Sequence, residues 1–322
     1  MVCKHKKMFE KLIRAEVTLE PFPHVIIDDF FDQDIYNRLT QEFPSGRQIK
    51  DLEITKEDYI AKRILSGESI ESISDVVDGL NDQIAEEYVR FYRKRQNDPS
   101  RYKPELEQNT AMSLQMNELN AINGLNSFKE IKNEWEKAKN VVVDKFKEWL
   151  PENIRNDEYL YKKLRDVSYC RGDIRVNTAV KQEGTTTLGP HIDNQQEIIA
   201  GLIYCKNKND KGEGGNLALY KLKDDKMEKF MSKKRRVPDK YVDLVKTVKY
   251  EENKAIFFPN SLKAIHAVTV RNINKFERRL VNLSIELPGK MTLWKSELGV
   301  DGELSKDESL GRYIWMKQHL KH

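Results

Sequence analysis

Residues 189–194 read GPHIDN and place a histidine and an aspartate two positions apart. His191 and Asp193 stand just before an apolar run typical of a strand, EIIAGLIYC at residues 197–205. In an extended segment residues i and i+2 point to the same side, so both side chains can reach one metal ion without strain. An HxD pair alone is weak evidence, because most such pairs lie on the surface. A metal site therefore needs a further ligand from elsewhere in the chain.

Only two of the six histidines fall in the strand-rich part of the sequence, His191 and His266. His266 follows the run AIFFPNSLKAI and begins HAVTV, which is typical of a late strand. Two imidazoles and one carboxylate on one face of a metal form the facial triad of non-haem Fe(II) oxygenases, which leaves positions open for a co-substrate and dioxygen. We therefore predict that His191, Asp193 and His266 bind Fe(II) and form the catalytic centre.

Arg278 and Arg279 precede the strand-like run LVNLSIEL at residues 280–287. An arginine presents a planar fork that suits bidentate pairing with a carboxylate, and an arginine that points into an apolar barrel needs an anion. Strand alternation places Leu280, Asn282 and Ser284 on the side of Arg278. This more polar side suits a pocket lining, so we predict that Arg278 binds the anion, with Arg279 as the alternative.

The elements that must position these residues change character near residue 165. Before residue 165, the spacing of apolar side chains predicts helices over residues 33–43 and 82–92. A capping box at residues 127–130 (SFKE) marks the start of a third predicted helix, over residues 127–149. A short apolar run at residues 25–27 predicts a strand before the first of these helices. After residue 165, seven strand-length runs occur in about 125 residues, which favours an antiparallel sandwich or barrel such as a jelly roll. The seven runs are DIRVNTAV, EIIAGLIYC, GNLALYKL, VDLVKTVKY, KAIFF, KAIHAVTV and RLVNLSIEL.

The bulk composition restricts the class of protein. Among 322 residues the charges nearly balance, with 56 basic and 52 acidic residues and a net charge of +4, whereas proteins that coat nucleic acid are usually more lopsided. Three cysteines without CxxC spacing predict no disulfide framework and a reducing compartment. No run of 18 apolar residues or signal peptide is apparent, so we expect a cytoplasmic protein without a membrane partner.

The ordered set of motifs resembles the 2-oxoglutarate- and Fe(II)-dependent dioxygenases, in particular their prolyl-4-hydroxylase-like branch of microbial or phage type. The matching segments are RVN, PHID, LIYC, KGEGGNLALY, AIFFPN, HAVTV and RRLVNLSIE, together with the opening PFPHVIIDDFFDQDIYNRLTQEFP. The resemblance covers residues 165–290 well and residues 20–44 loosely. It implies an α+β protein with a double-stranded β-helix core at residues 165–290, a mainly helical region at residues 1–164 packed outside it, and a C-terminal extension at residues 291–322.

The resemblance also implies the reaction and its residues. Fe(II), 2-oxoglutarate and O2 would be required, ascorbate would stimulate, and hydroxylation of an unactivated C–H bond would release succinate and CO2. Arg278 or Arg279 would bind the distal carboxylate of 2-oxoglutarate, assisted by Tyr204 and Asn282, although Tyr204 could equally be a core tyrosine. Gly214 and Gly215 match the turn of the family. Because the carboxylate of Asp193 is present, hydroxylation is favoured over halogenation.

Two other functions stay open at this point. A nucleic-acid demethylase of the same superfamily would use the basic segment MSKKRRVPDK at residues 231–240, although this segment lacks the interleaved aromatic residues of a base-stacking surface, and a solvated loop is favoured. A non-catalytic jelly-roll binding module would keep the metal site but would need no carboxylate receptor. The substrate, small-molecule or peptidyl, the oligomeric state, and the roles of residues 45–125 and 221–250 are not specified by any motif.

Overall fold

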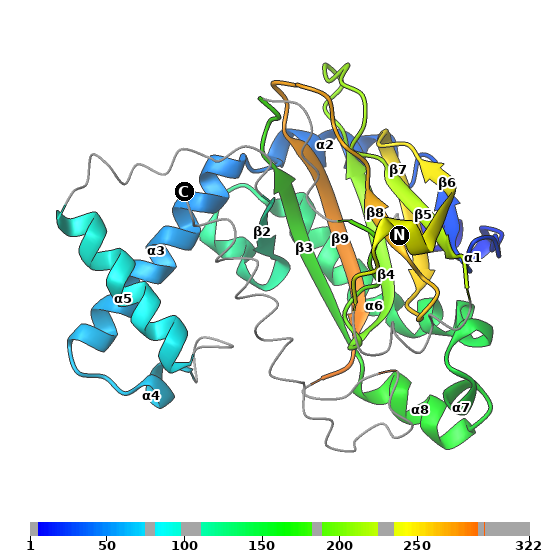
Figure 1. Ribbon diagram of the computed structural model, residues 1–322, viewed down its shortest axis with the longest axis horizontal. Helices are drawn as coiled ribbons and strands as arrows, with labels where there is room; N and C mark the ends of the chain where they lie inside the picture. The colour runs from blue at the N-terminus through cyan, green and yellow to red at the C-terminus, as the bar shows by residue number, and fades with distance from the viewer. Residues whose placement is uncertain are drawn as a thin grey trace.

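Two antiparallel sheets form the core of the molecule (Figure 1). The computed structural model describes residues 6–74, 81–97, 111–181, 189–224, 235–288 and 293. Within these residues the larger sheet has the strand order β1-β7-β4-β9-β3-β2 and the smaller one the order β6-β5-β8. The strands are β1 (Val25–Ile27), β2 (Ala111–Gln115), β3 (Tyr169–Asn177), β4 (Glu197–Cys205), β5 (Leu217–Leu222), β6 (Val242–Val248), β7 (Glu252–Pro259), β8 (His266–Val268) and β9 (Arg278–Glu286).

The two sheets pack face to face around an apolar layer of side chains from both. This layer includes Tyr204 and Phe258 from the larger sheet and Leu217 and Leu219 from the smaller one. Single bridges from His191 to His266 and to Arg236 extend the smaller sheet by the GPHIDN segment. The fold is thus α+β with a double-stranded β-helix core, as expected, and all seven predicted strand runs contain a strand.

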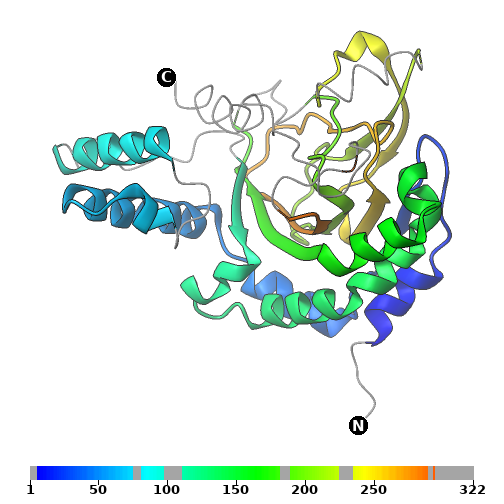
Figure 2. The same cartoon turned by 90° about the horizontal axis from the view of Figure 1, so that it is seen from below.

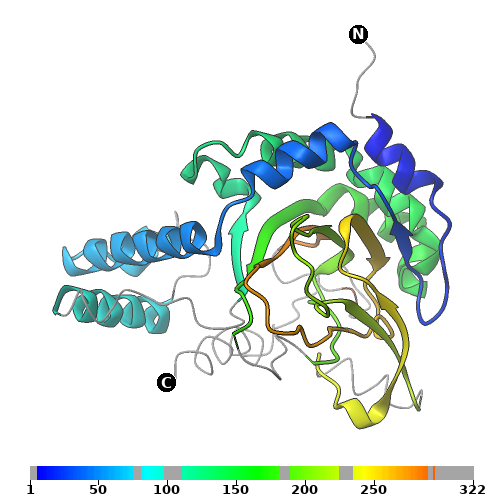
Figure 3. The same ribbon diagram turned by 90° about the horizontal axis from the view of Figure 1, so that it is seen from above.

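Helices cover the outer face of the larger sheet (Figures 2 and 3). Helix α6 (Asn126–Lys145) lies within the helix predicted over residues 127–149 except at its first residue, and it buries Ile131, Trp135, Ala138 and Val142 in the main apolar cluster of the described residues. The Trp135 indole donates to the backbone oxygen of Ser284 on β9 at 3.1 Å, which ties the helix to the centre of the sheet. The helices are α1 (Lys6–Arg14), α2 (Gln33–Glu42), α3 (Gly46–Leu65), α4 (Ile70–Ser74), α5 (Asp82–Asn97), η1 (Met116–Ala121), α6 (Asn126–Lys145), η2 (Lys147–Trp149), α7 (Glu152–Arg155), α8 (Glu158–Val167) and η4 (Asp239–Tyr241).

Helices α3 and α5 form an arm that extends away from the barrel, and they lie side by side in Figures 2 and 3. A small separate cluster of Ile60, Ile73 and Ala85 joins α3, α4 and α5. Arg95 of α5 adds ion pairs to Glu57 and Asp58 of α3. The predicted helix at residues 82–92 is confirmed and continues to Asn97, whereas α3 was not predicted.

The predicted capping box at Ser127 is wrong. Helix α6 begins one residue earlier, and the hydroxyl of Ser127 is buried without a hydrogen-bond partner among the described residues. The backbone amide of Ser127 instead donates to Glu42 Oε2 at 2.7 Å, so a carboxylate from the end of α2 satisfies this amide of the first helical turn. A complete capping box occurs at the start of α3, between Ser45 and Gln48.

Three predicted features fall partly or wholly outside the described residues. They are most of the C-terminal extension, the first part of the basic segment at residues 231–240, and part of residues 221–250. Among the helices that the structure describes, none has the length and apolar character needed to cross a membrane.

Candidate metal and co-substrate site

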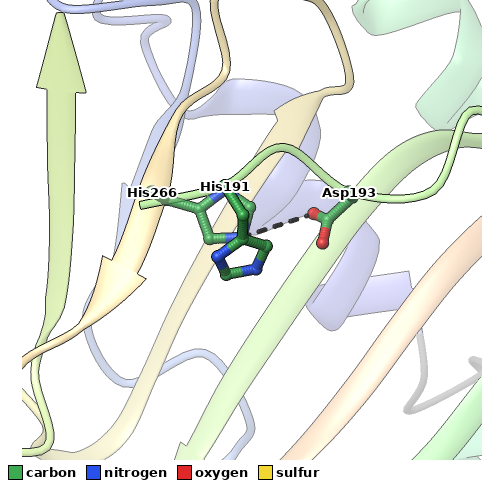
Figure 4. Close-up of side chains that lie close together, drawn as sticks. All are labelled: His191, Asp193 and His266. Carbon is green, nitrogen blue, oxygen red and sulfur yellow. Dashed lines mark ion pairs between the residues drawn. The ribbon is translucent and has the colours of Figure 1, made fainter. Parts of the chain in front are cut away.

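His191, Asp193 and His266 converge at the edge of the smaller sheet (Figure 4). His191 and Asp193 come from the segment before β4, and His266 opens β8. Reciprocal backbone hydrogen bonds of 3.0 and 2.9 Å between His191 and His266 hold the two segments together. One potential ligand atom from each of the three side chains lies within 4.8 Å of the others, and His266 Nε2 is 3.5 Å from Asp193 Oδ2.

Backbone carbonyls fix the orientation of both imidazoles. His191 Nδ1 lies 2.8 Å from the carbonyl oxygen of Gly189, and His266 Nδ1 lies 3.0 Å from that of Ala264. Each Nδ1 therefore donates its proton to a carbonyl, because the carbonyl can only accept. The Nε2 atoms are left without a backbone partner, which is the arrangement that ligating histidines use to present a lone pair to a metal.

The three groups influence one another's protonation. Burial, together with His266, lowers the pKa of His191 to about 3, so this ring is neutral at pH 7. Burial by itself would raise the pKa of Asp193 and lower that of His266. For Asp193 the charges of His266, His191 and Arg235 together outweigh burial and lower its pKa, and for His266 the pairing with Asp193 and the hydrogen bond to Ala264 together raise its pKa. A metal ion would replace the proton that lies between His266 and Asp193, because histidine and aspartate bind metals in their deprotonated forms.

Arg278 lies on the inner face of β9 between two tyrosine rings. Its guanidinium carbon is 5.3 Å from the ring centroid of Tyr204 and 5.2 Å from that of Tyr250. Its Nε donates to the carbonyl oxygen of Gly215 at 2.7 Å, and Nη1 makes a long contact of 3.4 Å with Asn177 Oδ1. The residue is only 5% exposed, yet within the described part of the chain no carboxylate lies within 4.0 Å of the guanidinium.

The glycine pair positions this arginine. Gly214 and Gly215 adopt φ angles of +80° and +69°, as the predicted turn requires. A Cβ on Gly214 would lie 1.9 Å from the carbonyl oxygen of Val270, and one on Gly215 would lie 3.1 Å from Cδ of Arg278. Only glycine lets the segment before β5 approach closely enough for the Gly215 carbonyl to accept from Arg278.

The other two residues predicted to bind 2-oxoglutarate lie elsewhere. Arg279 is on the outer face of β9, where its guanidinium covers the ring of Phe43 and is 3.6 Å from Glu277. Asn282 shares the inner face with Arg278 but lies four residues along the strand, beside Asp173 of β3. The structure thus brings together Arg278 and Tyr204 and separates Arg279 and Asn282 from them.

Sequence reasoning missed the inner face of β3, Tyr250, and Glu197 at the start of β4. Strand β3 reads YCRGDIRVN, and its alternate positions Arg171, Asp173, Arg175 and Asn177 are polar, which was the available signal. Arg175 Nε donates to both oxygens of Asp173 at 3.1 and 2.9 Å, and Arg171 pairs with Glu286 at 3.3 Å. Tyr250, which contacts Arg278, carries no signal beyond its place in a strand-like run.

The residues present fit the groups that the facial triad implies. The donor set is two imidazoles and a carboxylate, which suits Fe(II). Near them Arg278 is a buried cation without a counter-ion, and the buried hydroxyl of Tyr204 has no hydrogen-bond partner of normal geometry in the described residues. An unpaired buried cation and an unsatisfied hydroxyl are both costly, and one carboxylate would satisfy both.

Residues 177–285 match the family model of the 2OG-Fe(II) oxygenase superfamily. The matched segment begins at the last residue of β3 and ends within β9, so it contains the triad, the glycine pair, Tyr204 and Arg278. No curated protein matches the sequence.

Three solved structures are similar in chain trace at low sequence identity. A prolyl 4-hydroxylase structure from Phytophthora capsici has a TM-score of 0.44 and 11% identity, covering 99% of this chain and 76% of that one. A Pseudomonas putida prolyl-4-hydroxylase has a TM-score of 0.39 and 9% identity, covering 84% and 95%. A prolyl hydroxylase from Trichoplax adhaerens, in complex with a peptide fragment of the hypoxia inducible factor oxygen degradation domain, has a TM-score of 0.39 and 10% identity, covering 88% and 90%.

Proposed function

We propose that this chain, whose residues 177–285 match the 2OG-Fe(II) oxygenase superfamily, is an oxygenase that uses Fe(II), 2-oxoglutarate and O2. The reaction is hydroxylation of an unactivated C–H bond of a small-molecule or peptidyl substrate, with release of succinate and CO2. The observation that carries the proposal is the buried Arg278, which has no carboxylate partner among the described residues, in the same barrel as a triad of two histidines and one aspartate.

Each residue has a stated part in this reaction. His191, Asp193 and His266 would hold Fe(II), which, once loaded with 2-oxoglutarate and O2, supplies the oxidising power that removes hydrogen from carbon. Arg278 would bind the distal carboxylate of 2-oxoglutarate through its Nη atoms, because its Nε is already committed to Gly215. Tyr204 would donate its otherwise unsatisfied hydroxyl to the same carboxylate.

The ligand set also bears on the type of reaction. Asp193 supplies a carboxylate at the position where a halogenating enzyme would need an open site for halide. Full occupation of the triad by protein side chains therefore supports hydroxylation.

An anaerobic titration tests the proposal. Metal-free protein is titrated with Fe(II) and then with 2-oxoglutarate, while the visible charge-transfer band of the iron–2-oxoglutarate chelate is recorded. We expect the band to appear in the wild type and to be absent in His266→Ala. Metal binding without any band would overturn the oxygenase reaction and would favour a non-catalytic metal-binding barrel.

A further inference from the structure

Charged side chains line the inner face of the larger sheet at the end away from Arg278. Asp173 and Arg175 of β3 form one ion pair, and Arg171 and Glu286 form a second. Although the Arg175 side chain points between the two sheets, it is 45% exposed, whereas that of Asp173 is 2% exposed. Solvent therefore reaches the inner face here, and a ligand of the barrel could do the same.

A β-bulge aims one more acid at this region. Tyr204, Leu202 and Ala200 of β4 point inward, so regular alternation would direct Ile198 inward next and Glu197 outward. The register between β4 and β9 shifts between Glu197 and Ile199, which leaves Glu197 directly opposite Glu286 on the inner face. Bulges next to active sites commonly redirect a side chain in this way.

Glu197 differs from the other acids of this cluster because its carboxylate has no partner among the described residues. No basic nitrogen of the described residues lies within 4.0 Å of its carboxylate, and no described donor hydrogen-bonds to it. Burial, Asp193 and Glu286 raise the pKa of Glu197 well above its ordinary value, against the opposing charges of Arg175 and Arg235. Two acids opposite each other on neighbouring strands are destabilising, so the free protein bears a cost here.

We propose that the substrate carries a cationic group, a protonated amine or a guanidinium, that binds between Glu197 and the metal triad and pairs with Glu197. This inference rests on the proposed hydroxylase function and adds a substrate class to it. A tight turn, closed by the hydrogen bond from the Glu197 amide to the Asn194 carbonyl oxygen at 2.9 Å, joins Asp193 to Glu197, so a cation paired with Glu197 would be held within reach of the metal. Its charge would offset the repulsion between Glu197 and Glu286.

The basic groups in the same region favour a cation over an anion. Arg175 is already neutralised by Asp173, and Arg171 by Glu286. Arg235 also faces the triad, where its Nε donates to the carbonyl oxygen of Ile192 at 3.2 Å. Its charge is close to that of Asp193, whose pKa it helps to lower. Arg235 has no carboxylate within 4.0 Å among the described residues either, but its charge acts on Asp193, so Glu197 is the one acid of the cluster without a direct counter-charge in this part of the chain.

Three six-carbon probes of different charge test the inference: n-hexylammonium, n-hexanol and n-hexanoate. Each is added anaerobically to protein loaded with Fe(II) and 2-oxoglutarate, and binding is read from the change in the charge-transfer band. We expect hexylammonium to perturb the band at concentrations where the other two do not. Glu197→Gln should weaken hexylammonium binding roughly 10- to 100-fold, as for one charge-assisted contact, and leave the band itself intact. Glu158→Gln, at a surface side chain that is 84% exposed, is the matched control and should bind as the wild type does.

Thermal unfolding of the metal-free protein gives a second readout. Because Glu197→Gln removes a like-charge contact, it should raise the Tm, whereas Glu158→Gln should leave it unchanged.

A lower Tm with unchanged hexylammonium binding would make Glu197 a structural residue and overturn the inference. A band perturbed by hexanoate, or by none of the probes, would overturn the cationic substrate while the oxygenase reaction stands. Absence of the band in the wild type would overturn the oxygenase reaction, and the substrate class with it.

Discussion

Replacement of Arg278 by methionine separates the binding of 2-oxoglutarate from the binding of metal. Met has a similar length and is apolar, so Arg278→Met removes the charge while filling much of the space between Tyr204 and Tyr250. The guanidinium Nε is bound to the Gly215 carbonyl, and the Nη atoms are left for a carboxylate. Loss of two charge-assisted hydrogen bonds at about 1.5 kcal/mol each is about 3 kcal/mol, or roughly a 100-fold weaker affinity for 2-oxoglutarate.

The same substitution should have little effect on stability in the absence of 2-oxoglutarate. It removes the 2.7 Å hydrogen bond to Gly215, and it also removes a buried cation that has no carboxylate partner among the described residues. Those two contributions are each of the order of 1–3 kcal/mol and opposite in sign. We therefore expect a Tm within a few degrees of the wild type and an unchanged affinity for Fe(II).

The assay is an anaerobic titration of Fe(II)-loaded protein with 2-oxoglutarate, followed by the charge-transfer band. Arg279→Met is the matched control: its side chain lies on the outer face of β9 against Phe43, so its affinity for 2-oxoglutarate should equal that of the wild type. Wild-type affinity in Arg278→Met, or a large loss in Arg279→Met, would refute the assignment of Arg278 as the carboxylate receptor.

Three further predictions use local contacts. Tyr204→Phe removes a hydroxyl that has no other partner of normal geometry in the described residues, so the affinity for 2-oxoglutarate should fall about 5-fold (about 1 kcal/mol) in the same titration. Unchanged affinity would make Tyr204 a core residue only. Gly201→Ala should lower the free energy of unfolding, measured by urea denaturation, by about 1–3 kcal/mol, because the new Cβ would lie 2.4 Å from Phe257 and 2.8 Å from a backbone oxygen. A neutral result would mean that the sheet relaxes around the added methyl group. Ser45→Ala should lower the free energy of unfolding by about 1 kcal/mol because it removes a capping box, whereas Ser127→Ala should leave it unchanged or raise it. Equal losses in the two variants would contradict the reassignment of the cap.

The strands could be predicted from the sequence because each one alternates or is continuously apolar over a strand length. Strand β2 was missed because AMSLQ is short and mixed, and it is a strand only through pairing with β3 at the sheet edge. Helix α3 was missed for a related reason: few of its residues are buried in the main core, so its apolar pattern is weak. Tertiary contacts, rather than local propensity, decide both elements.

Candidate ligands could be predicted because residue type and spacing restrict metal chemistry strongly. The side of β9 that carries Arg278 followed from alternation, which holds along that whole strand. Glu197 could not be found in this way, because the bulge after it reverses the side on which its side chain lies. The cap of α6 was misassigned because its acceptor is Glu42, which is 85 residues away in the chain.

Strand β9 sets the distance between two charged groups at opposite ends of the inner face of the barrel. It is hydrogen-bonded on both sides, to β3 and β4, and it carries Arg278 at its first residue and Glu286 at its last. Eight steps of about 3.4 Å separate these two residues by roughly 27 Å, far more than the length of one 2-oxoglutarate molecule. Arg278 and Glu197 share no partner among the described residues, so substitutions at the two positions should be additive in the free energy of unfolding of the metal-free protein. The residues around Glu286 and Glu197 could thus change during evolution, and with them the group of the substrate that they bind, while the residues that hold Arg278 stay the same.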